Sequence, residues 1–214
     1  MPLKMNQRNK MDGLKLLREY VVPHSVAAVI FDPQYRSVLG KLKYGNEGAR
    51  MSDRVALPQM SNDIIKLFIG AISTALRPSG HCFMWVDKLI LCEGTFNMGF
   101  HFGGLEMVDL ITWAKPRIGM GYRTRRKCEY LLVLQKIPKR AKGIWTDHGI
   151  PDVWQEKIIN PTHPHQKPEG LTQRLILAIT KLGDLVVDPC AGSYSTMYAA
   201  NHADRDFLGC DLKG

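Results

Sequence analysis

Two short segments place an acidic residue directly after an apolar run, where its side chain could hold a ligand. The first is FDPQY, in which Asp32, Pro33 and Tyr35 follow the apolar run 26–31. A carboxylate, together with a backbone carbonyl turned outward by proline, can accept hydrogen bonds from an exocyclic amine. An aromatic ring nearby can stack on the base that carries this amine, as in enzymes that act on extruded nucleotides. Asp-Pro pairs also form ordinary turns, so a purely structural role is the alternative.

The second segment is DPCAGSYS at 188–195, where an apolar run ends in an acid and a turn of small residues leads into a helical pattern. Such a turn lets a ligand approach the backbone at a helix N-terminus. Asp211 follows Gly192 by 19 residues and ends the next apolar run, where an acid can bind ribose hydroxyls. Because Gly192 is the one glycine in the turn, an adenosine-bearing ligand without a pyrophosphate is favoured over a dinucleotide. A structural strand-to-helix turn is the alternative.

Both segments require parallel strands to position them, and the apolar pattern predicts such strands. Short apolar runs predict strands at 26–31, 81–86, 108–113, 129–135, 185–188 and 207–211. Helical spacing predicts helices that begin at Ser61, Pro168 and Thr196, with the residues 78–80 ending the first of them. Strands that alternate with helices imply an α/β fold with a mostly parallel sheet. With 214 residues, 45% of them hydrophobic, the chain is expected to form one domain over 1–214.

Positive charge is concentrated in one part of the chain. The net charge is +9, and the stretch 115–142 holds ten basic residues against one acid, Glu129. The rest of the chain is balanced, so the excess forms a patch that favours a polyanion such as nucleic acid. A solvated basic face without a partner is the alternative.

Several other functional classes are disfavoured. The five cysteines form no CxxC pair, which argues against a disulfide framework and a zinc site, so no metal is expected. The sequence has no run of about 18 apolar residues, so neither a membrane partner nor secretion is expected, and the predicted location is cytoplasmic.

These segments together resemble the β class of DNA amino-methyltransferases. FDPQY is similar to that family's DPPY motif, DPCAGSYS to its DPFxGSGT motif, and HPHQKP at 163–168 to its HPTQKP motif. MDGLKLL around Asp12 is a supporting match. So is the stretch 112–136, which is similar to the family's WxK segment followed by a strand that opens with HE. The five matches occur in the family's order, with the catalytic motif first and the cofactor motif late.

The resemblance implies a Rossmann-like, doubly wound fold of the S-adenosylmethionine-dependent type with circularly permuted motifs. It implies methyl transfer from S-adenosylmethionine to N6 of adenine in double-stranded DNA, by base flipping and direct attack of the amine. In this family an acidic first motif residue, here Asp32, is associated with adenine and serine with cytosine N4. A cytosine-N4 enzyme and a non-catalytic DNA-binding relic are the alternatives. A role in restriction-modification is implied as well.

The resemblance also assigns residues. Asp32, Pro33 and Tyr35 are expected to hold the target amine. The cofactor is expected to contact Asp12, Gly13, Asp32, Gln166, Lys167, Pro168, Asp188, Cys190, Gly192, Ser193, Tyr194, Ser195 and Asp211. The sequence departs from the family's pattern at Gln34, which replaces the second proline, at Tyr194 and Ser195, which replace Gly-Thr, and at Cys128, which stands where histidine is usual.

DNA is expected to contact basic loops, with candidate recognition segments at 36–60 and 136–162. The basic residues assigned to DNA are Lys41, Lys43, Arg50, Arg54, Arg117, Arg123, Arg125, Arg126, Lys139, Arg140 and Lys142. The second segment is short for a recognition element, so the DNA site is expected to be either short or shared across a homodimer.

Overall fold

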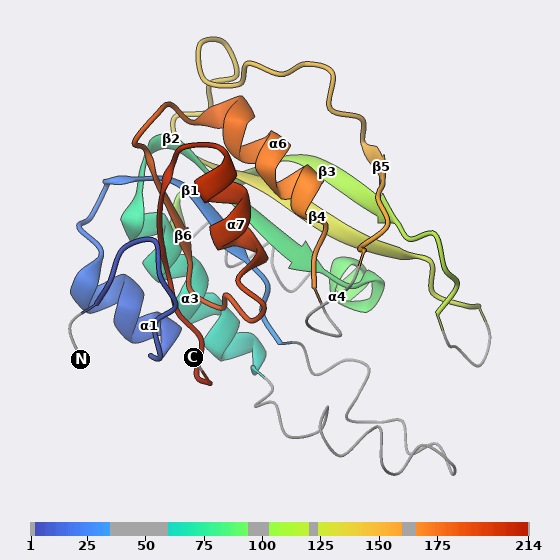
Figure 1. Cartoon of the computed structure of the whole chain (residues 1–214), viewed down its shortest axis with the longest axis horizontal. Helices are drawn as coiled ribbons and strands as arrows, with labels where there is room; N and C mark the ends of the chain where they lie inside the picture. The colour runs from blue at the N-terminus through green and yellow to red at the C-terminus, as the bar shows by residue number, and fades with distance from the viewer. Residues whose placement is uncertain (1–2, 35–59, 94–102, 120–123, 160–165, 214) are drawn as a thin grey trace.

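The computed structural model describes residues 3–34, 60–93, 103–119, 124–159 and 166–213. Their strands form one seven-stranded sheet in the order β5-β3-β4-β2-β1-β6-β7 (Figure 1). Strand β4 is antiparallel to both of its neighbours, and the other pairs are parallel. The strands are β1 (Val26–Phe31), β2 (Leu76–Val86), β3 (Leu105–Ala114), β4 (Cys128–Lys136), β5 (Val153–Gln155), β6 (Leu185–Asp188) and β7 (Asp206–Gly209).

Helical segments cover both faces of this sheet. They are α1 (Gly13–Lys15), the π-helical turn η1 (Leu16–Tyr20), α3 (Asn62–Ala75), α4 (Lys88–Glu93), α6 (Glu169–Ile179) and α7 (Ser195–His202). One core cluster joins η1, α3 and α4 to one face, with Phe68 stacked on Phe31 at 5.1 Å between ring centres. A second cluster joins α6 and α7 to the other face. The predicted doubly wound, mostly parallel α/β fold is therefore confirmed.

The first long helix begins as predicted but ends differently. Ser61 caps α3, since its hydroxyl accepts a hydrogen bond from the backbone N–H of Ile64 at 3.3 Å. The prediction that residues 78–80 end this helix before a strand at 81 was wrong, because the helix ends at Ala75 and β2 starts at Leu76. The register between β1 and β2 shifts after Val26, so the extra residues of β2 form an irregularity where proline and glycine are tolerated.

The described part of the segment that follows β4 is tied to the fold at several points. Strand β5 extends the sheet beside β3, with Trp154 in register with Trp113. The carboxylate of Glu156 accepts hydrogen bonds from the backbone N–H groups of Gly170 and Leu171, both at 3.0 Å. These bonds satisfy donors that the first turn of α6 would otherwise leave unpaired. The segment therefore helps to fix where α6 begins.

The N-terminal segment lies against the last strand. The backbone N–H of Met11 donates to the carbonyl of Asp211, and the N–H of Asp211 donates to the carbonyl of Asn9, both at 3.1 Å. The strand predicted to run to Asp211 ends at Gly209, and Asp211 instead forms an isolated bridge with Lys10. In the described part of the chain, no helix has the length and apolar character needed to cross a bilayer.

Candidate active site

Three carboxylates lie at the ends of three neighbouring parallel strands. Asp32 follows β1, Asp188 is the last residue of β6, and Asp211 lies just beyond β7. Because β1, β6 and β7 are adjacent and parallel, their carboxyl ends share one edge of the sheet. Burial is the main cause that raises the pKa of Asp188, and the nearby carboxylates of Asp32 and Asp211 add to the rise. Ligands of open α/β sheets bind at this kind of edge.

Asp32 begins a chain of alternating charges. The ammonium group of Lys167 lies 3.1 Å from Oδ2 of Asp32 and 2.9 Å from Oε2 of Glu129. The ammonium group of Lys115 contacts the other oxygen of Glu129. The side chains of Asp32 and Lys167 are only 28% and 15% exposed, so water screens these contacts weakly.

The charges of this chain shift one another's pKa values. Burial by itself would lower the pKa of Lys167, but the carboxylates of Asp32 and Glu129 raise it above its usual value. Burial would raise the pKa of Glu129, yet the ammonium groups of Lys167 and Lys115 lower it to about 2. The pKa of Asp32 is raised by burial, with Lys167 opposing the rise. At neutral pH Glu129 is therefore an ionised carboxylate that lies between the ammonium groups of Lys167 and Lys115.

Two tryptophans lie beneath the ammonium groups. Nζ of Lys167 is 5.1 Å from the ring centre of Trp85, and Nζ of Lys115 is 4.8 Å from the ring centre of Trp113. The two indole rings meet edge to face, with their centres 6.0 Å apart. Cations over indole faces are held by the ring quadrupole, so this floor restricts where the ammonium groups can lie.

The turn 188–195 is organised by Asp188. Its Oδ2 accepts a hydrogen bond from the hydroxyl of Thr196 at 2.6 Å, and its Oδ1 accepts one from the N–H of Cys190 at 3.0 Å. Burial nevertheless raises the pKa of Asp188 to about 7. Gly192 and Tyr194 have φ of +47° and +61°, which lets the chain reverse before α7. The arrangement places an acid and a tight turn at the start of a helix.

The ring of Tyr194 points into the protein core, while its backbone forms part of the turn 188–195. The side chain is 0% exposed and belongs to the core cluster beneath α6 and α7. Its hydroxyl donates to the carbonyl of Asn9 at 2.8 Å and accepts from the N–H of Asn9 at 3.2 Å. Tyr194 therefore anchors the N-terminal segment beside the turn, a connection for which the sequence gives no local signal.

Asp12 and Gly13 reach the same turn from the N-terminal side. The side chain of Asp12 caps α1 by accepting a hydrogen bond from the N–H of Lys15 at 2.9 Å. A Cβ atom on Gly13 would lie 2.1 Å from the carbonyl oxygen of Pro189, so only glycine lets the two backbones approach so closely. The structure thus brings MDGLKLL next to DPCAGSYS, although the two are far apart in the sequence.

The other predicted cofactor residues vary in exposure. Pro168, Tyr194 and Ser195 are buried, while Gln166, Cys190 and Ser193 are half-buried and Gly192 is exposed. Pro168 precedes α6, and its carbonyl accepts a hydrogen bond from the hydroxyl of Thr172 at 2.9 Å. Lys167 contacts Asp32 and Glu129, so its ammonium group lies on the side of the predicted target-amine residues.

The predicted DNA-binding residues are only partly described. Tyr35 of the target-amine set lies outside the described residues, as do Lys41, Lys43, Arg50, Arg54, Arg123 and nearly all of the segment 36–60. Lys139 pairs with Glu106 at 2.6 Å. The remaining described members are exposed, apart from a half-buried Arg126; they are Arg117, Arg125, Arg126, Arg140 and Lys142.

Sequence reasoning missed the partners that surround Asp32. Glu129 and Lys115 lie in the stretch 112–136 that matches the family's WxK segment and HE strand opening, but neither was assigned a role at the site. Strand alternation could have placed Glu129 on the same face as Leu131 and Val133, beneath α6. The contact of Lys167 with Glu129 depends on the sheet order, for which the sequence has no local signal.

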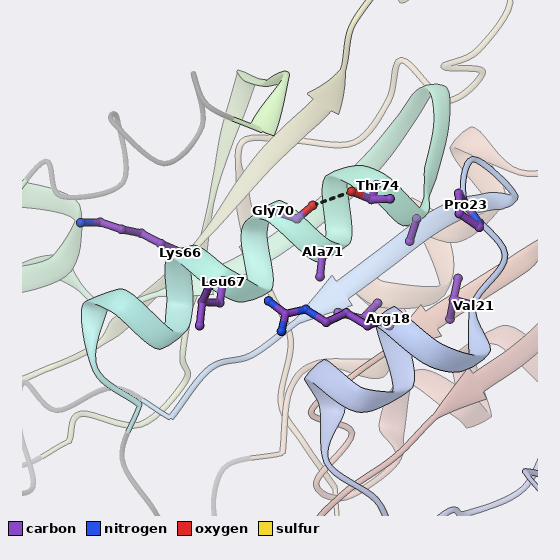
Figure 2. Close-up of a pocket in the computed structure, with 10 residues that line it drawn as sticks. Arg18, Val21, Pro23, Lys66, Leu67, Gly70, Ala71 and Thr74 are labelled. Carbon is purple, nitrogen blue, oxygen red and sulfur yellow. Dashed lines mark hydrogen bonds between the residues drawn. The ribbon is translucent and has the colours of Figure 1, made fainter.

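A groove of about 360 Å³ lies elsewhere, between η1 and α3 (Figure 2). It is lined by apolar side chains such as Leu17, Val21 and Leu67, and the Arg18 side chain extends between the two helices. The sheet separates it from α6 and Lys167, because η1 and α3 cover the opposite face. None of its lining residues belongs to the predicted site.

The thiols of Cys190 and Cys210, near the site, have raised pKa values. Burial raises the pKa of Cys190 well above its usual value and that of Cys210 to about 12. Thiols in this state are poor nucleophiles at neutral pH. The geometry therefore offers carboxylates, an ammonium group and a helix N-terminal turn for chemistry, and no activated thiol among these residues.

The doubly wound sheet, with acids at the carboxyl edge and a turn opening α7, defines the Rossmann-like class of ligand-binding α/β proteins. A family model described as DNA methylase matches residues 26–214, and the chain belongs to this family. It is 48% identical over 209 residues to the type II methyltransferase M.HhaII of Haemophilus parahaemolyticus, covering 97% of this chain and 91% of that protein.

A more distant relative and two solved structures also match nearly the whole chain. Identity to the type II methyltransferase M2.DpnII of Streptococcus pneumoniae is 26% over 237 residues, covering 96% of this chain and 86% of that protein. The M1.HpyAVI complex with SAM superposes with a TM-score of 0.65 at 21% identity, covering 96% and 92% of the two chains. The PvuII cytosine-N4-specific DNA methyltransferase superposes with a TM-score of 0.72 at 17% identity, covering 96% and 81%.

Proposed function

We propose that this protein transfers the methyl group of S-adenosylmethionine to N6 of adenine in double-stranded DNA. The observation that carries the proposal is the position of Asp32 at the end of β1, beside the Asp188 turn at the end of the adjacent strand β6. An acceptor for the target amine and a turn suited to the cofactor thus lie next to each other. Membership of the DNA methylase family supports DNA as the substrate.

The choice of adenine rests on Asp32. The PvuII enzyme has the same fold and is described as cytosine-N4-specific, so the fold alone does not select the base. An acid at the first position of FDPQY favours adenine, as the family resemblance implies. The type II methyltransferases M.HhaII and M2.DpnII, named among the relatives, support a role in restriction-modification.

The residues at the sheet edge fit an S-adenosylmethionine molecule. This ligand carries positive charge on its sulfonium and ammonium groups, and the edge holds the carboxylates of Asp32, Asp188 and Asp211. In the proposal, Asp211 binds the ribose hydroxyls, and the turn from Asp188 to Ser195 holds the rest of the molecule. The remaining contacts to the cofactor come, in the proposal, from Asp12, Gly13, Gln166 and Pro168.

In the proposed reaction, Asp32, Pro33 and Tyr35 hold the flipped base. When bound, S-adenosylmethionine supplies a sulfonium methyl group that the amine nitrogen takes as the carbon–sulfur bond breaks, leaving S-adenosylhomocysteine. The carboxylate of Asp32 accepts a hydrogen bond from the amine and stabilises the positive charge that grows on nitrogen. That nitrogen then loses one proton, either to Asp32 or to solvent, and N6-methyladenine remains. The site acts mainly by positioning the two reactants.

The basic loops complete the proposal by binding duplex DNA. Exposed cations such as Arg117, Arg125 and Lys142 would contact phosphates, and the segments 36–60 and 136–162 would recognise the sequence. The whole chain 1–214 would act as one domain. The proposal includes a homodimer on DNA, which analytical ultracentrifugation with and without a duplex would show.

The decisive experiment identifies the modified nucleoside. The protein is incubated with S-adenosylmethionine and unmethylated genomic DNA, and the DNA is digested and analysed by mass spectrometry. We expect N6-methyl-2′-deoxyadenosine, and none of it with the Asp32→Ala variant. N4-methyl-2′-deoxycytidine would contradict the assignment of adenine to Asp32. Cofactor binding without any product would instead favour the DNA-binding relic.

A further inference from the structure

We propose that Glu129 is a positioning residue for the target-amine site, and that Lys115 holds Glu129 in place. The inference rests on the proposed function, because it concerns how Asp32 is prepared to accept the target amine. Glu129 and Lys115 lie outside FDPQY, DPCAGSYS and HPHQKP; both belong to the matching stretch 112–136, where the resemblance assigns neither of them a role. The structure nevertheless joins both of them to Asp32 through one lysine.

The geometry shows that three separate parts of the chain meet at Lys167. Asp32 comes from the end of β1, Glu129 from the start of β4, and Lys167 from the residue before Pro168 and α6. Lys167 lies 3.1 Å from Asp32 and 2.9 Å from Glu129, so it bridges two carboxylates. Its ammonium group would move if either carboxylate were lost, because each supplies half of its ionic contacts in this cluster.

Glu129 is itself held on two sides. In the β3–β4 pair, Glu129 is in register with Trp113, and the ammonium group of Lys115 contacts Oε1 of Glu129 while lying over the Trp113 ring. Lys167 lies over Trp85 in the same way. Because Trp85 and Trp113 are buried and in contact, the two cations rest on a rigid aromatic floor.

The consequence for Asp32 is electrostatic. Lys167 shares its positive charge between Glu129 and Asp32, so Glu129 prevents the lysine from fully neutralising the carboxylate that the amine needs as acceptor. Burial has the largest effect and raises the pKa of Asp32. Among the neighbouring charges, the Lys167 ammonium lowers this pKa, the Glu129 carboxylate raises it and the Lys115 ammonium lowers it. Asp188 also faces Asp32 from β6, since the Asp32 carboxylate raises the pKa of Asp188.

The test measures methyl transfer in a single turnover as a function of pH, with saturating DNA and S-adenosylmethionine. In Glu129→Gln the Asp32 pKa should fall, so the acidic limb of the rate profile should move to lower pH. In Lys115→Met the Asp32 pKa should rise, so the limb should move to higher pH. At neutral pH we expect Glu129→Gln to lose about 10- to 100-fold in rate, because small misplacements of a reacting group have effects of this size. Cofactor affinity should change less than the rate of methyl transfer does, because Asp188 and its turn are left intact.

A matched control is Glu19→Gln, which makes the same chemical change in an exposed ion pair with Lys15. Its rate and pH profile should match those of the parent protein. Should Glu129→Gln fail to fold, Lys115→Met still tests the inference, because an acidic limb that stays in place in that variant would overturn it. A purely structural role of Glu129 would leave the acidic limb in place.

The outcomes separate the two proposals. Opposite shifts of the limb in Glu129→Gln and Lys115→Met support the positioning role. Unmoved limbs, or shifts in the same direction, overturn it while the parent protein still produces N6-methyladenine. A parent protein that binds S-adenosylmethionine but makes no methylated base refutes the proposed function and, with it, this inference.

Discussion

Replacing Tyr194 by glycine should destabilise the protein, although glycine is the residue that the resembled motif DPFxGSGT has there. Tyr194 has φ of +61°, a conformation that suits glycine, so the local backbone would become less strained. The tyrosine ring, however, is fully buried and packs edge to face against Phe207 with ring centres 6.4 Å apart. The guanidinium group of Arg8 lies 5.1 Å from the centre of the same ring.

These effects can be compared as free energies. Truncating a buried aromatic side chain costs about 3–5 kcal/mol, because the removed atoms leave a cavity. Relief of the left-handed backbone returns about 1–2 kcal/mol, and the added freedom of glycine in the unfolded chain takes back about 0.5–1 kcal/mol. The free energy of unfolding should therefore fall by about 2–4 kcal/mol. For a chain of this size that corresponds to a drop in Tm of about 5–15 °C.

Scanning calorimetry of the parent protein, Tyr194→Gly and Tyr194→Phe would test this reasoning. Tyr194→Phe keeps the ring but removes both hydrogen bonds with Asn9, so it should lose about 1–3 kcal/mol. The expected order of Tm is parent protein, then phenylalanine, then glycine. A glycine variant as stable as the parent protein would show that backbone strain outweighs packing, and that the buried ring is not what anchors the N-terminal segment.

Three further predictions concern the carboxylates. Because the pKa of Asp188 in the folded protein is about 7, above its usual value of 3.8, the folded state holds a proton that the unfolded state releases. This group should lower the free energy of unfolding as pH rises from 4 to 7, and in pH-dependent melts Asp188→Asn should remove that contribution. Asp211→Ala should weaken S-adenosylmethionine binding in calorimetric titrations by about tenfold or more, since it removes an acceptor for the ribose; unchanged affinity would refute its ribose role. Asp32→Ala and Tyr35→Ala should each abolish methylation but leave cofactor affinity nearly intact, and full activity in either variant would show that the target pocket is misplaced.

The fold was predictable from the sequence to the extent that its signals are local. The strands at Val26–Phe31 and Leu185–Asp188 have the predicted bounds, because each is a short β-branched run between turn residues. The capping role of Ser61 was likewise predictable from its place before a helical pattern. The course of β2 through Pro78 and Gly80 was not predictable from the sequence. Proline and glycine usually interrupt a strand, but here the pairing with β1 and a register shift accommodate them. The short segments α1, η1 and α4 were missed because they are too brief to show periodicity.

The candidate site was likewise predictable only where its signals are local. Asp32, Asp188 and Asp211 each follow an apolar run, so their common edge follows from strand direction and was predictable. Glu129 lies at the start of an antiparallel strand, and Lys167 can join it to Asp32 because β2 alone lies between β1 and β4 in the sheet. That order depends on long-range packing, which composition and spacing do not encode. The charges around Asp32 thus come partly from the stretch 112–136, which the sequence indicated as a basic surface and a supporting motif match, and Lys115 links that stretch to the half-buried network.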